Sequence, residues 1–403
     1  MAVDQATGTE TMPHPRGLRI LLGAAAISVT GDGVLVTAAP LMAAALTRDP
    51  FQVGLVAAAG YAAWIIFGLP AGALVDRWDR RRVMYTADLL RALILAGFAA
   101  LAFANMASIA TLVIAVFLVG VGSCFFDPAS QSLMPDLAGR DRDNLTRANG
   151  ALWGIDVFGK SLAGPPLGAV TFAAGRALPF AADALSFVVS ALLVRTLPAV
   201  PREPWEHPPV RDAVVSGLRF VASHSDLRRL ALGMGAYNFA WNLGFATLVL
   251  FAQDVLSLGA AGYGALMASG AVGGILAGWL VPKLASGAAA PVAYAVALTG
   301  QALVWSAIAF GHTQWVAFAA IAVLGAASTA VSVIGGTARQ LLTPPAMLGR
   351  MISATRLVGI GSAASGAFVG GLLSNLYGLT APMIAAVGLA ALAACYFALI
   401  ARR

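Results

Sequence analysis

Long hydrophobic runs make up most of the chain, and short polar segments separate them. Each run holds about 20 residues or more, the helix length that crosses about 30 Å of hydrocarbon. Open strands would leave backbone groups unpaired in lipid, so helices are the expected structure. The pattern predicts twelve membrane-spanning helices, at Leu18–Leu46, Val53–Val75, Val83–Ala104, Ser108–Phe126, Arg147–Ala174, Leu178–Leu197, Leu230–Leu256, Gly262–Leu284, Pro291–Phe310, Gln314–Thr337, Met351–Ser374 and Thr380–Ile400.

The composition agrees with a membrane protein and excludes a soluble domain. Of 403 residues, 59% are hydrophobic and only 11% are charged, and the mean hydropathy is +0.83. Soluble proteins contain about 25% charged residues because their exposed surface has to be polar. The net charge of +7 is compatible with nucleic-acid binding, but the charges form short clusters between hydrophobic runs. We therefore expect the lipid bilayer as a partner, and no nucleic acid.

Motifs for metal, nucleotide and hydrolytic chemistry are missing from the sequence. Cys124 and Cys395 lie inside hydrophobic runs, without a second cysteine or a histidine at ligand spacing. The chain has no GxxxxGK(S/T) phosphate loop, no HExxH and no GxSxG. We expect no cofactor, no metal and no enzymatic activity, and an ion gradient as the source of energy.

Positive charges are distributed unevenly among the predicted loops. If the N-terminus is inside, the inside loops hold nearly all the arginines, and the outside loops hold only Arg48 and Arg176. This asymmetry follows the positive-inside rule. We expect a multi-pass protein of the bacterial cytoplasmic (inner) membrane, with an even number of spans and both termini in the cytoplasm.

A parallel repeat divides the chain into two halves. Residues Ala129–Pro135 resemble Ala338–Pro344, and Ala71–Val75 resemble Ala277–Val281. Parallel repeats in transporters form two bundles with the cargo site between them. The predicted organisation is an N-terminal cytoplasmic tail, a six-helix bundle, a proline-rich cytoplasmic linker, a second six-helix bundle and a C-terminal tail, at residues 1–17, 18–197, 198–229, 230–401 and 402–403.

The segment Gly72–Arg81 resembles the signature of the major facilitator superfamily between its second and third helices. Asp79 stands where that signature has glycine. The resemblance implies an intracellular latch formed by Gly72, Asp76, Arg77 and Arg80, with Asp127 as the acidic partner of Arg80. It also implies an all-α membrane fold of twelve helices in two pseudo-symmetric bundles. On physical grounds, Gly72 would let the second helix approach a neighbour closely.

Three further motifs carry the resemblance to one branch of that superfamily. Gly164, Pro165 and Gly168 match its antiporter signature, and the proline removes a helical hydrogen-bond donor. Phe125–Ala129 and Asp88–Arg91 resemble its drug, siderophore and macrolide exporters, which include transmembrane secretion effectors. The resemblance implies export by antiport rather than uptake.

Ionisable side chains inside the predicted spans are the sharper indication of transport. Asp32 lies near the middle of the first span, and Asp156 and Lys160 lie one turn apart near the middle of the fifth. A charged side chain at this depth costs about 3 kcal/mol, so it normally meets water, a partner or a cargo. Burial disfavours a charged carboxylate and a nearby ammonium favours it, so we expect these three residues to couple transport to protons. The alternative is a buried, neutralised Asp156–Lys160 pair that only holds helices together.

Aromatic and amide side chains at the same depth of the second half suggest where the cargo binds. Stacking area and a few hydrogen bonds in a hydrophobic cavity suit an amphipathic molecule. The candidates for cargo contact are Tyr237, Asn238, Trp241, Asn242 and Gln301, although amides can also simply join helices. We interpret Asp88 and Arg91 as a structural pair at i,i+3 spacing, and leave Asp183 without an assigned role.

Together these features predict a secondary active transporter that works as a monomer. It would export a hydrophobic or amphipathic small molecule, such as a drug or secondary metabolite, in exchange for protons. One alternative of the same fold is a siderophore exporter or a small-molecule importer. An alternative of another class, a transport-inactive membrane sensor, would need a soluble domain or clustered ligands, and the sequence shows neither.

Overall fold

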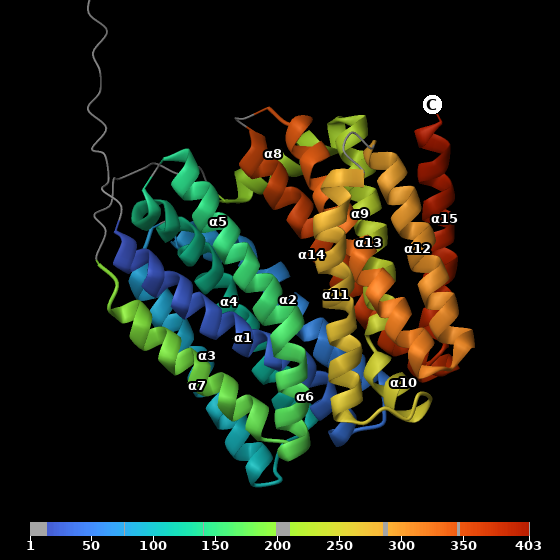
Figure 1. The fold of residues 1–403 in the computed structure, drawn as a ribbon, viewed down its shortest axis with the longest axis horizontal. Helices are drawn as coiled ribbons and strands as arrows, with labels where there is room; N and C mark the ends of the chain where they lie inside the picture. The colour runs from blue at the N-terminus through green and yellow to red at the C-terminus, as the bar shows by residue number, and fades with distance from the viewer. Residues whose placement is uncertain are drawn as a thin grey trace, which may run out of the picture.

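The computed structural model describes residues 14–75, 77–139, 141–198, 210–284, 289–344 and 347–402. These residues are nearly all helical, and no strand occurs among them. Figure 1 shows the helices arranged as two bundles. The first bundle consists of α1 (Pro15–Leu46), α2 (Pro50–Val75), α3 (Arg80–Phe103), α4 (Ile109–Ala138), α5 (Arg142–Asp156), η1 (Val157–Ala163), α6 (Gly164–Ala174) and α7 (Leu178–Arg195).

The second bundle follows a short connecting helix, α8. Within the described ranges it consists of α9 (Ser225–Phe245), α10 (Leu248–Asp254), α11 (Ala260–Leu284), α12 (Ala290–Gly311), α13 (Gln314–Leu341), α14 (Leu348–Tyr377) and α15 (Ala381–Ala401). Ten described helices are individually long and hydrophobic enough to cross a membrane. The other two predicted spans consist of helices joined end to end, α5–η1–α6 and α9–α10. The expected twelve spans in two bundles are therefore present.

The fifth span is interrupted because it contains consecutive prolines. Pro165 and Pro166 have no N–H to donate to the preceding turn, so the α-helical hydrogen bonds cannot continue through them. Immediately before them, Gly164 N–H donates to Gly159 C=O five residues earlier, which is the π-helical pattern of η1. The antiporter signature thus coincides with a change of helix type within the bundle.

Two seams join the bundles, α2 with α14 and α6 with α11. At the first seam Gly54 and Gly371 bring the two backbones together, since a Cβ at Gly54 would lie 2.8 Å from Gly371 Cα. Beside them the rings of Phe51 and Phe368 meet edge to face, with centroids 5.5 Å apart. These contacts lie at the ends of α2 and α14 that are farthest from the chain termini (Figure 1).

An ion pair and a second close contact lie at the same end of the molecule. Arg48 Nη1 lies 3.3 Å from Asp254 Oδ1, which connects the α1–α2 loop to the end of α10. At the second seam, a Cβ at Gly264 of α11 would lie 2.9 Å from the carbonyl oxygen of Pro165 in α6. These contacts between the bundles are therefore concentrated away from the end that carries the termini.

Part of the predicted linker is helical. The helix α8 (Val210–Ser223) packs against α14, where a Cβ at Gly217 would lie 2.9 Å from the carbonyl carbon of Arg350. The proline-rich portion, residues 199–209, lies outside the described residues. The predicted linker therefore contains a docked helix in the portion that the structure describes, and the domain boundaries stay a prediction.

Glycine brings α1 against the interrupted fifth span. A Cβ at Gly33 of α1 would lie 2.8 Å from Lys160 Cα and 3.0 Å from Gly164 Cα. Both neighbouring atoms belong to the backbone, so neither can move aside independently of its helix. The neighbour of Gly33 in sequence is Asp32, and the close contact therefore fixes the position of that carboxylate relative to η1.

The substitution Gly33→Ala is expected to reduce the free energy of unfolding by about 1–3 kcal/mol, because the added methyl overpacks two backbones. The midpoint of thermal unfolding of the purified protein in detergent would report this loss. Gly97→Ala is the matched control in α3, since a Cβ there meets no atom within 4 Å. Equal midpoints for the two variants would contradict the close contact.

Candidate functional site

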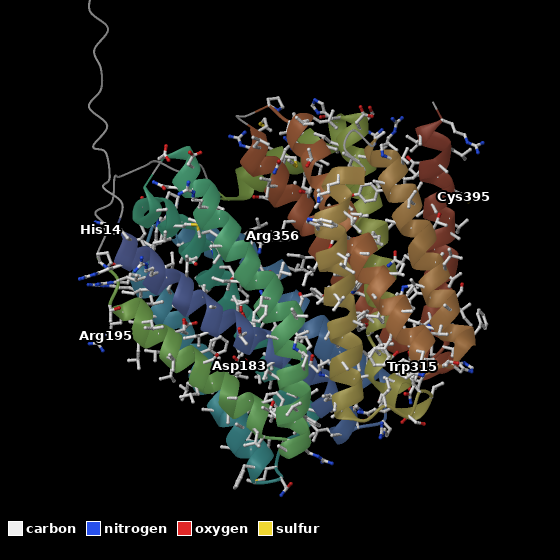
Figure 2. All side chains as sticks on the ribbon, in the orientation of Figure 1. His14, Asp183, Arg195, Trp315, Arg356 and Cys395 are labelled. Carbon is white, nitrogen blue, oxygen red and sulfur yellow. The ribbon has the colours of Figure 1, made fainter. Side chains whose placement is uncertain are left out.

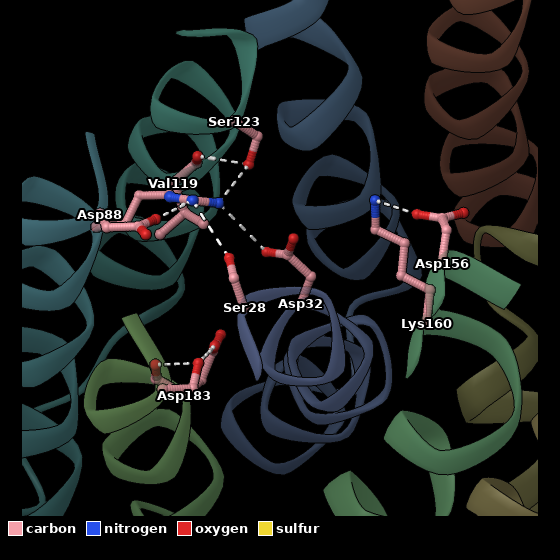
Figure 3. Close-up of polar contacts among 10 residues, drawn as sticks. Ser28, Asp32, Asp88, Val119, Ser123, Asp156, Lys160 and Asp183 are labelled. Carbon is pink, nitrogen blue, oxygen red and sulfur yellow. Dashed lines mark hydrogen bonds and ion pairs between the residues drawn. The ribbon is translucent and has the colours of Figure 1, made fainter. Parts of the chain in front are cut away.

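A fully buried arginine, Arg91 of α3, is the centre of a polar network in the first bundle (Figure 3). Its guanidinium makes an ion pair with Asp88, one turn earlier on the same helix. It also donates hydrogen bonds to Ser123 Oγ of α4 at 3.2 Å and to Ser28 Oγ of α1 at 3.4 Å. Arg91 therefore connects α3 to two neighbouring helices.

Aromatic rings and a glycine complete the surroundings of Arg91. Its guanidinium carbon lies 4.7 Å from the centroid of Phe126 and 4.1 Å from that of Phe187. Gly122 leaves space for the side chain, because a Cβ there would lie 2.8 Å from Arg91 Cδ. Cation–π attraction compensates part of the lost hydration of the guanidinium. The pair of Asp88 and Arg91 expected from their spacing is thus present, as part of a larger network.

Asp32 of α1 brings a second carboxylate to Arg91. Its Oδ1 lies 3.7 Å from Arg91 Nη1, and 14% of its side chain is exposed. Figure 3 shows this carboxylate between the Arg91 network and Lys160. Lys160 is also within electrostatic reach of Asp32. Asp32 therefore lies between two cations from different helices.

Lys160 of η1 pairs with Asp156, whose Oδ1 lies 3.4 Å from Nζ. The side chains are 36% and 52% exposed, respectively. The pair is therefore present but partly exposed, and not buried as the alternative interpretation required. The physical reason is the position of η1 at the interface between the bundles, where it contacts α11 instead of being enclosed within its own bundle.

Two more carboxylates adjoin the network. Asp183 of α7 is buried and accepts a hydrogen bond from Ser186 Oγ at 3.0 Å. Its other oxygen, Oδ2, is buried without a hydrogen-bond partner among the described residues. Asp127 of α4 lies within electrostatic reach of Lys160 and Arg91. Neither residue was assigned to proton coupling from the sequence.

The acidic partner of Arg80 differs from the expected one. Arg80 Nη1 lies 2.7 Å from Asp136 Oδ2 and donates to Ser132 C=O at 2.9 Å. Asp127 was expected here, but it lies more than two turns before Asp136 in α4. There it is within electrostatic reach of Lys160 and Arg91. The correction follows from the length of α4, which extends to Ala138 and carries Asp136 to the start of α3.

The remaining latch residues make fewer contacts than expected. A Cβ at Gly72 would meet no atom of the described residues within 4 Å, so the predicted close approach of α2 to a neighbour is absent among them in this conformation. The bundles are in contact at the opposite end of α2, which accounts for the free space. Arg77 is exposed, and Asp76 lies outside the described residues.

The antiporter signature lies where three helices meet. Gly164 packs against Gly33 of α1, and a Cβ at Gly168 would lie 3.2 Å from the carbonyl carbon of Val34. On the other side, Pro165 C=O faces Gly264 of α11. The motif thus links α1, which carries Asp32, to the second bundle.

The cargo-contact candidates of the second bundle fall into two groups. Trp241 stacks on Phe245 with centroids 5.3 Å apart and is partly exposed, and Asn238 is also partly exposed. Asn242 is largely buried and lies near Tyr61 of α2 across the interface. Asn242 is thus the candidate that adjoins the first bundle.

Tyr237 and Gln301 are packed within the second bundle. Gln301 is fully buried and donates to Tyr237 C=O at 3.2 Å. The Tyr237 hydroxyl donates to Leu324 C=O at 3.4 Å. In this conformation the structure places both residues between α9, α12 and α13, where they join helices and do not face the interface. The alternative that amides connect helices therefore describes Gln301.

Sequence reasoning missed a cation on the opposite wall. Arg356 of α14 is exposed, and its guanidinium carbon lies 4.3 Å from the ring centroid of Trp64 in α2. It is within electrostatic reach of Asp127. A mid-span arginine in a half with almost no acidic residues was the sequence signal that could have identified it.

A hydrophobic hollow of about 820 Å³ lies along α2, α4 and α14. Its wall includes Leu55, Phe117 and Phe368, and Ser365 is its single polar residue. Since no ionisable side chain borders it, this hollow is separate from the charged network. It offers space for hydrocarbon but no group that can bind a proton.

The charged network holds more carboxylates than cations. Asp32, Asp88, Asp127 and Asp183 lie within electrostatic reach of Arg91, and Asp156 pairs with Lys160. If all five carboxylates were ionised, these two cations of the first bundle would leave it an excess of three negative charges. Such an excess is costly in a medium of low dielectric constant, and binding protons is one way to reduce it. The arrangement is therefore suited to proton uptake and release.

Residues 15–402 match the family described as transmembrane secretion effector, MFS_3. The multidrug efflux pump Tap of Mycolicibacterium fortuitum is 30% identical over 224 residues, which cover 53% of this chain and 54% of Tap. The enterobactin exporter EntS of Citrobacter koseri is 26% identical over 390 residues, covering 93% of this chain and 89% of EntS. The chain thus spans about half the length of Tap and most of EntS.

Solved transporters share the fold at low sequence identity. A bacterial homolog of the human lysosomal transporter Spinster, in an inward-facing and occupied conformation, superposes with a TM-score of 0.78 at 16% identity and 96% coverage of both chains. The nucleoside transporter NupG gives 0.74 at 14% identity, covering 96% of this chain and 99% of NupG. The expected fold is confirmed by these likenesses. The chain is a membrane transporter and not an enzyme, and it belongs to the transmembrane secretion effector family of the major facilitator superfamily.

Proposed function

We propose that this transporter exports an amphipathic small molecule from the bacterial cytoplasm in exchange for protons, by alternating access between its two bundles. Two relatives are named as exporters, one of several drugs and one of enterobactin. Both names support export as the direction. Because the two bundles of one chain enclose the proposed route, a monomer is sufficient for the cycle.

The observation that carries the proposal is the position of Asp32 between Arg91 and Lys160. Its Oδ1 lies 3.7 Å from Arg91 Nη1, and it is partly exposed, whereas Asp88 is fully buried. Asp32 is therefore the carboxylate of the Arg91 network that a proton from the interface can reach. The charged groups that face it are Asp88 and Arg91 of α3, Asp127 of α4, Lys160 of η1 and Asp183 of α7.

Protonation of Asp32 would alter how α1 is held. The neutral acid loses its attraction to Arg91 and Lys160, so α1 is held less strongly against α3 and η1. Since Gly33 packs directly on the backbone of Lys160 and Gly164, this change is transmitted to the antiporter signature and from there to α11. A proton on one carboxylate thereby shifts the balance between two packings of the bundles, as coupling requires.

The distribution of contacts between the bundles fits loading from the cytoplasm. Contacts such as Arg48–Asp254 and Gly54–Gly371 lie at the end away from the termini. If both termini are cytoplasmic, as the arginine asymmetry predicts, this conformation is closed toward the outside. The ion pair of Arg80 and Asp136 then holds the inner ends of α3 and α4 as one unit that forms the latch when the cytoplasmic side closes.

A siderophore is the second candidate cargo. The enterobactin exporter matches 93% of this chain, whereas the multidrug pump matches 53%. This greater coverage favours a siderophore-like molecule over an unrelated set of drugs. Both candidates require the same proton-driven export, so they differ only in what the space between the bundles accepts.

The substitution Asp32→Asn is expected to reduce proton-driven export at least about fivefold, because a coupling free energy of 1–3 kcal/mol corresponds to roughly 5–150-fold. Export would be measured as efflux from cells of fluorescein, Nile red and ethidium, which are anionic, neutral and cationic. The dye that the wild type exports would be followed with and without a protonophore.

Asp156→Asn is the matched control for this test, because it removes a half-exposed carboxylate from Lys160 and leaves Arg91 untouched. It should retain most of the protonophore-sensitive efflux. If Asp32→Asn exports at the wild-type rate and remains sensitive to the protonophore, Asp32 does not couple transport. If no dye is exported at all by the wild type, proton-driven export of amphipathic molecules is itself the wrong function.

Substitution of Asp88 is expected to lower the stability of the protein more than it affects proton coupling. Removing one partner of a buried ion pair costs about 3–5 kcal/mol, so Asp88→Asn should lower the midpoint of thermal unfolding markedly. Asp254→Asn, which breaks the exposed pair with Arg48, should leave the midpoint nearly unchanged. Comparable midpoints for these two variants would mean that Arg91 does not depend on Asp88.

A further inference from the structure

Arg356 stands on the wall of the second bundle that faces the first. Figure 2 labels it at the boundary between the two bundles. By the helical rise of 1.5 Å per residue, it lies about 12 Å along α14 from Leu348, well inside the span. Its side chain is exposed, and its guanidinium rests on the ring of Trp64 across the interface at 4.3 Å.

The guanidinium of Arg356 has no counter-charge in its own bundle. From Ser225 to the end of the chain the sequence contains two carboxylates, Asp226 and Asp254. Asp226 pairs with Arg229, and Asp254 pairs with the α1–α2 loop. A charged residue at membrane depth normally meets a partner, water or cargo. The negative charge that Arg356 attracts therefore has to come from the opposite bundle or from a bound molecule.

The hydrogen-bonding edge of Arg356 is available. Among the described residues no hydrogen bond or ion pair involves its guanidinium, and the contact with Trp64 occupies the flat face. A guanidinium presents five N–H donors in a plane, in a fork that matches a carboxylate with two parallel hydrogen bonds. By contrast Arg339, the other cation that extends into this bundle, already contacts Tyr294 and Met234.

We propose that Arg356 and Trp64 bind the acidic end of the cargo, so that the exported molecule is an amphipathic acid with a planar, carboxylate-like anionic group. This proposal rests on the export function proposed above and names the chemical class of its substrate. The guanidinium edge holds the anion, and the indole supports an adjoining flat or hydrophobic portion of the molecule.

The charge of the opposite wall gives the acid a defined orientation. The first bundle presents the surplus of carboxylates that includes Asp127 and Asp32, and these repel an anion. The acidic end of the cargo is therefore directed to α14, and its hydrophobic portion lies toward Trp241 and Phe245 of α9, which stack on each other. Asp127 is the internal competitor, because it is the carboxylate within electrostatic reach of Arg356.

The test compares 2-naphthoate with 2-naphthamide, two probes of the same ring and nearly the same size that differ in charge. Equilibrium binding to the purified full-length transporter would be measured without a proton gradient. The wild type should bind the carboxylate about tenfold more tightly than the amide, as expected for a charge-assisted bidentate contact. Arg356→Gln should remove this preference and leave the affinity for the amide unchanged.

Arg339→Gln is the control of equal charge change in the same bundle, and it should keep the preference for the carboxylate. Equal affinity of the wild type for both probes, or no binding of the carboxylate up to millimolar concentration, overturns the assignment. An equal loss of affinity for both probes in Arg356→Gln also overturns the assignment, since that result would indicate a structural role for Arg356.

A double variant distinguishes binding of the cargo by Arg356 from pairing of Arg356 with Asp127. If Arg356 serves only to pair with Asp127, the double substitution Arg356→Asp with Asp127→Arg should restore dye export, and this result would overturn the proposal. Because naphthoate binding is measured without transport, its failure is distinguishable from failure of proton-driven export. Protonophore-sensitive dye efflux combined with no preference for the carboxylate would reject the acid and leave the exporter.

Discussion

The structure depends on keeping one guanidinium ionised inside a protein that hydrocarbon surrounds. Arg91 is fully buried, and its charge is tolerable only because partners from several helices surround it. Asp88 supplies the main counter-charge, hydroxyls of α1 and α4 accept hydrogen bonds, and two aromatic rings cover the faces. Because these groups come from α1, α3, α4 and α7, satisfying Arg91 also fixes how four helices of the first bundle pack.

The fold could be predicted from the sequence because lipid imposes a simple rule on it. Hydrophobic length alone located the spans, and the repeat of Ala129–Pro135 in Ala338–Pro344 indicated two equivalent halves. Length could not show that the fifth span changes helix type at Val157, since that depends on which donors Pro165 and Pro166 remove. Length also could not reveal that α8 docks on α14, because its 14 residues are too few to cross a membrane, although their amphipathic pattern is helical.

The candidate site was predicted less completely, since depth in a span does not reveal the direction of a side chain. Asp32 and Lys160 were found as ionisable side chains at depth, whereas Gln301, chosen as an amide at a similar depth, is packed inside its bundle. Arg80 was assigned to Asp127 when Asp136 is its partner, because the end of α4 could not be placed within two turns. Arg356 was missed, although the scarcity of acids in the second half already left it without a counter-charge.

The absence of carboxylates after Asp254 separates two tasks that one chain performs. On the proposed mechanism every group that can take up the driving ion lies in the first half, while the second half only shapes and attracts what is carried. Substitutions in α9 to α15 can then change cargo specificity without disturbing proton coupling. We therefore expect related transporters of different molecules to differ chiefly in the second half. A chimaera that exchanges this half should transport the new cargo with the original proton coupling.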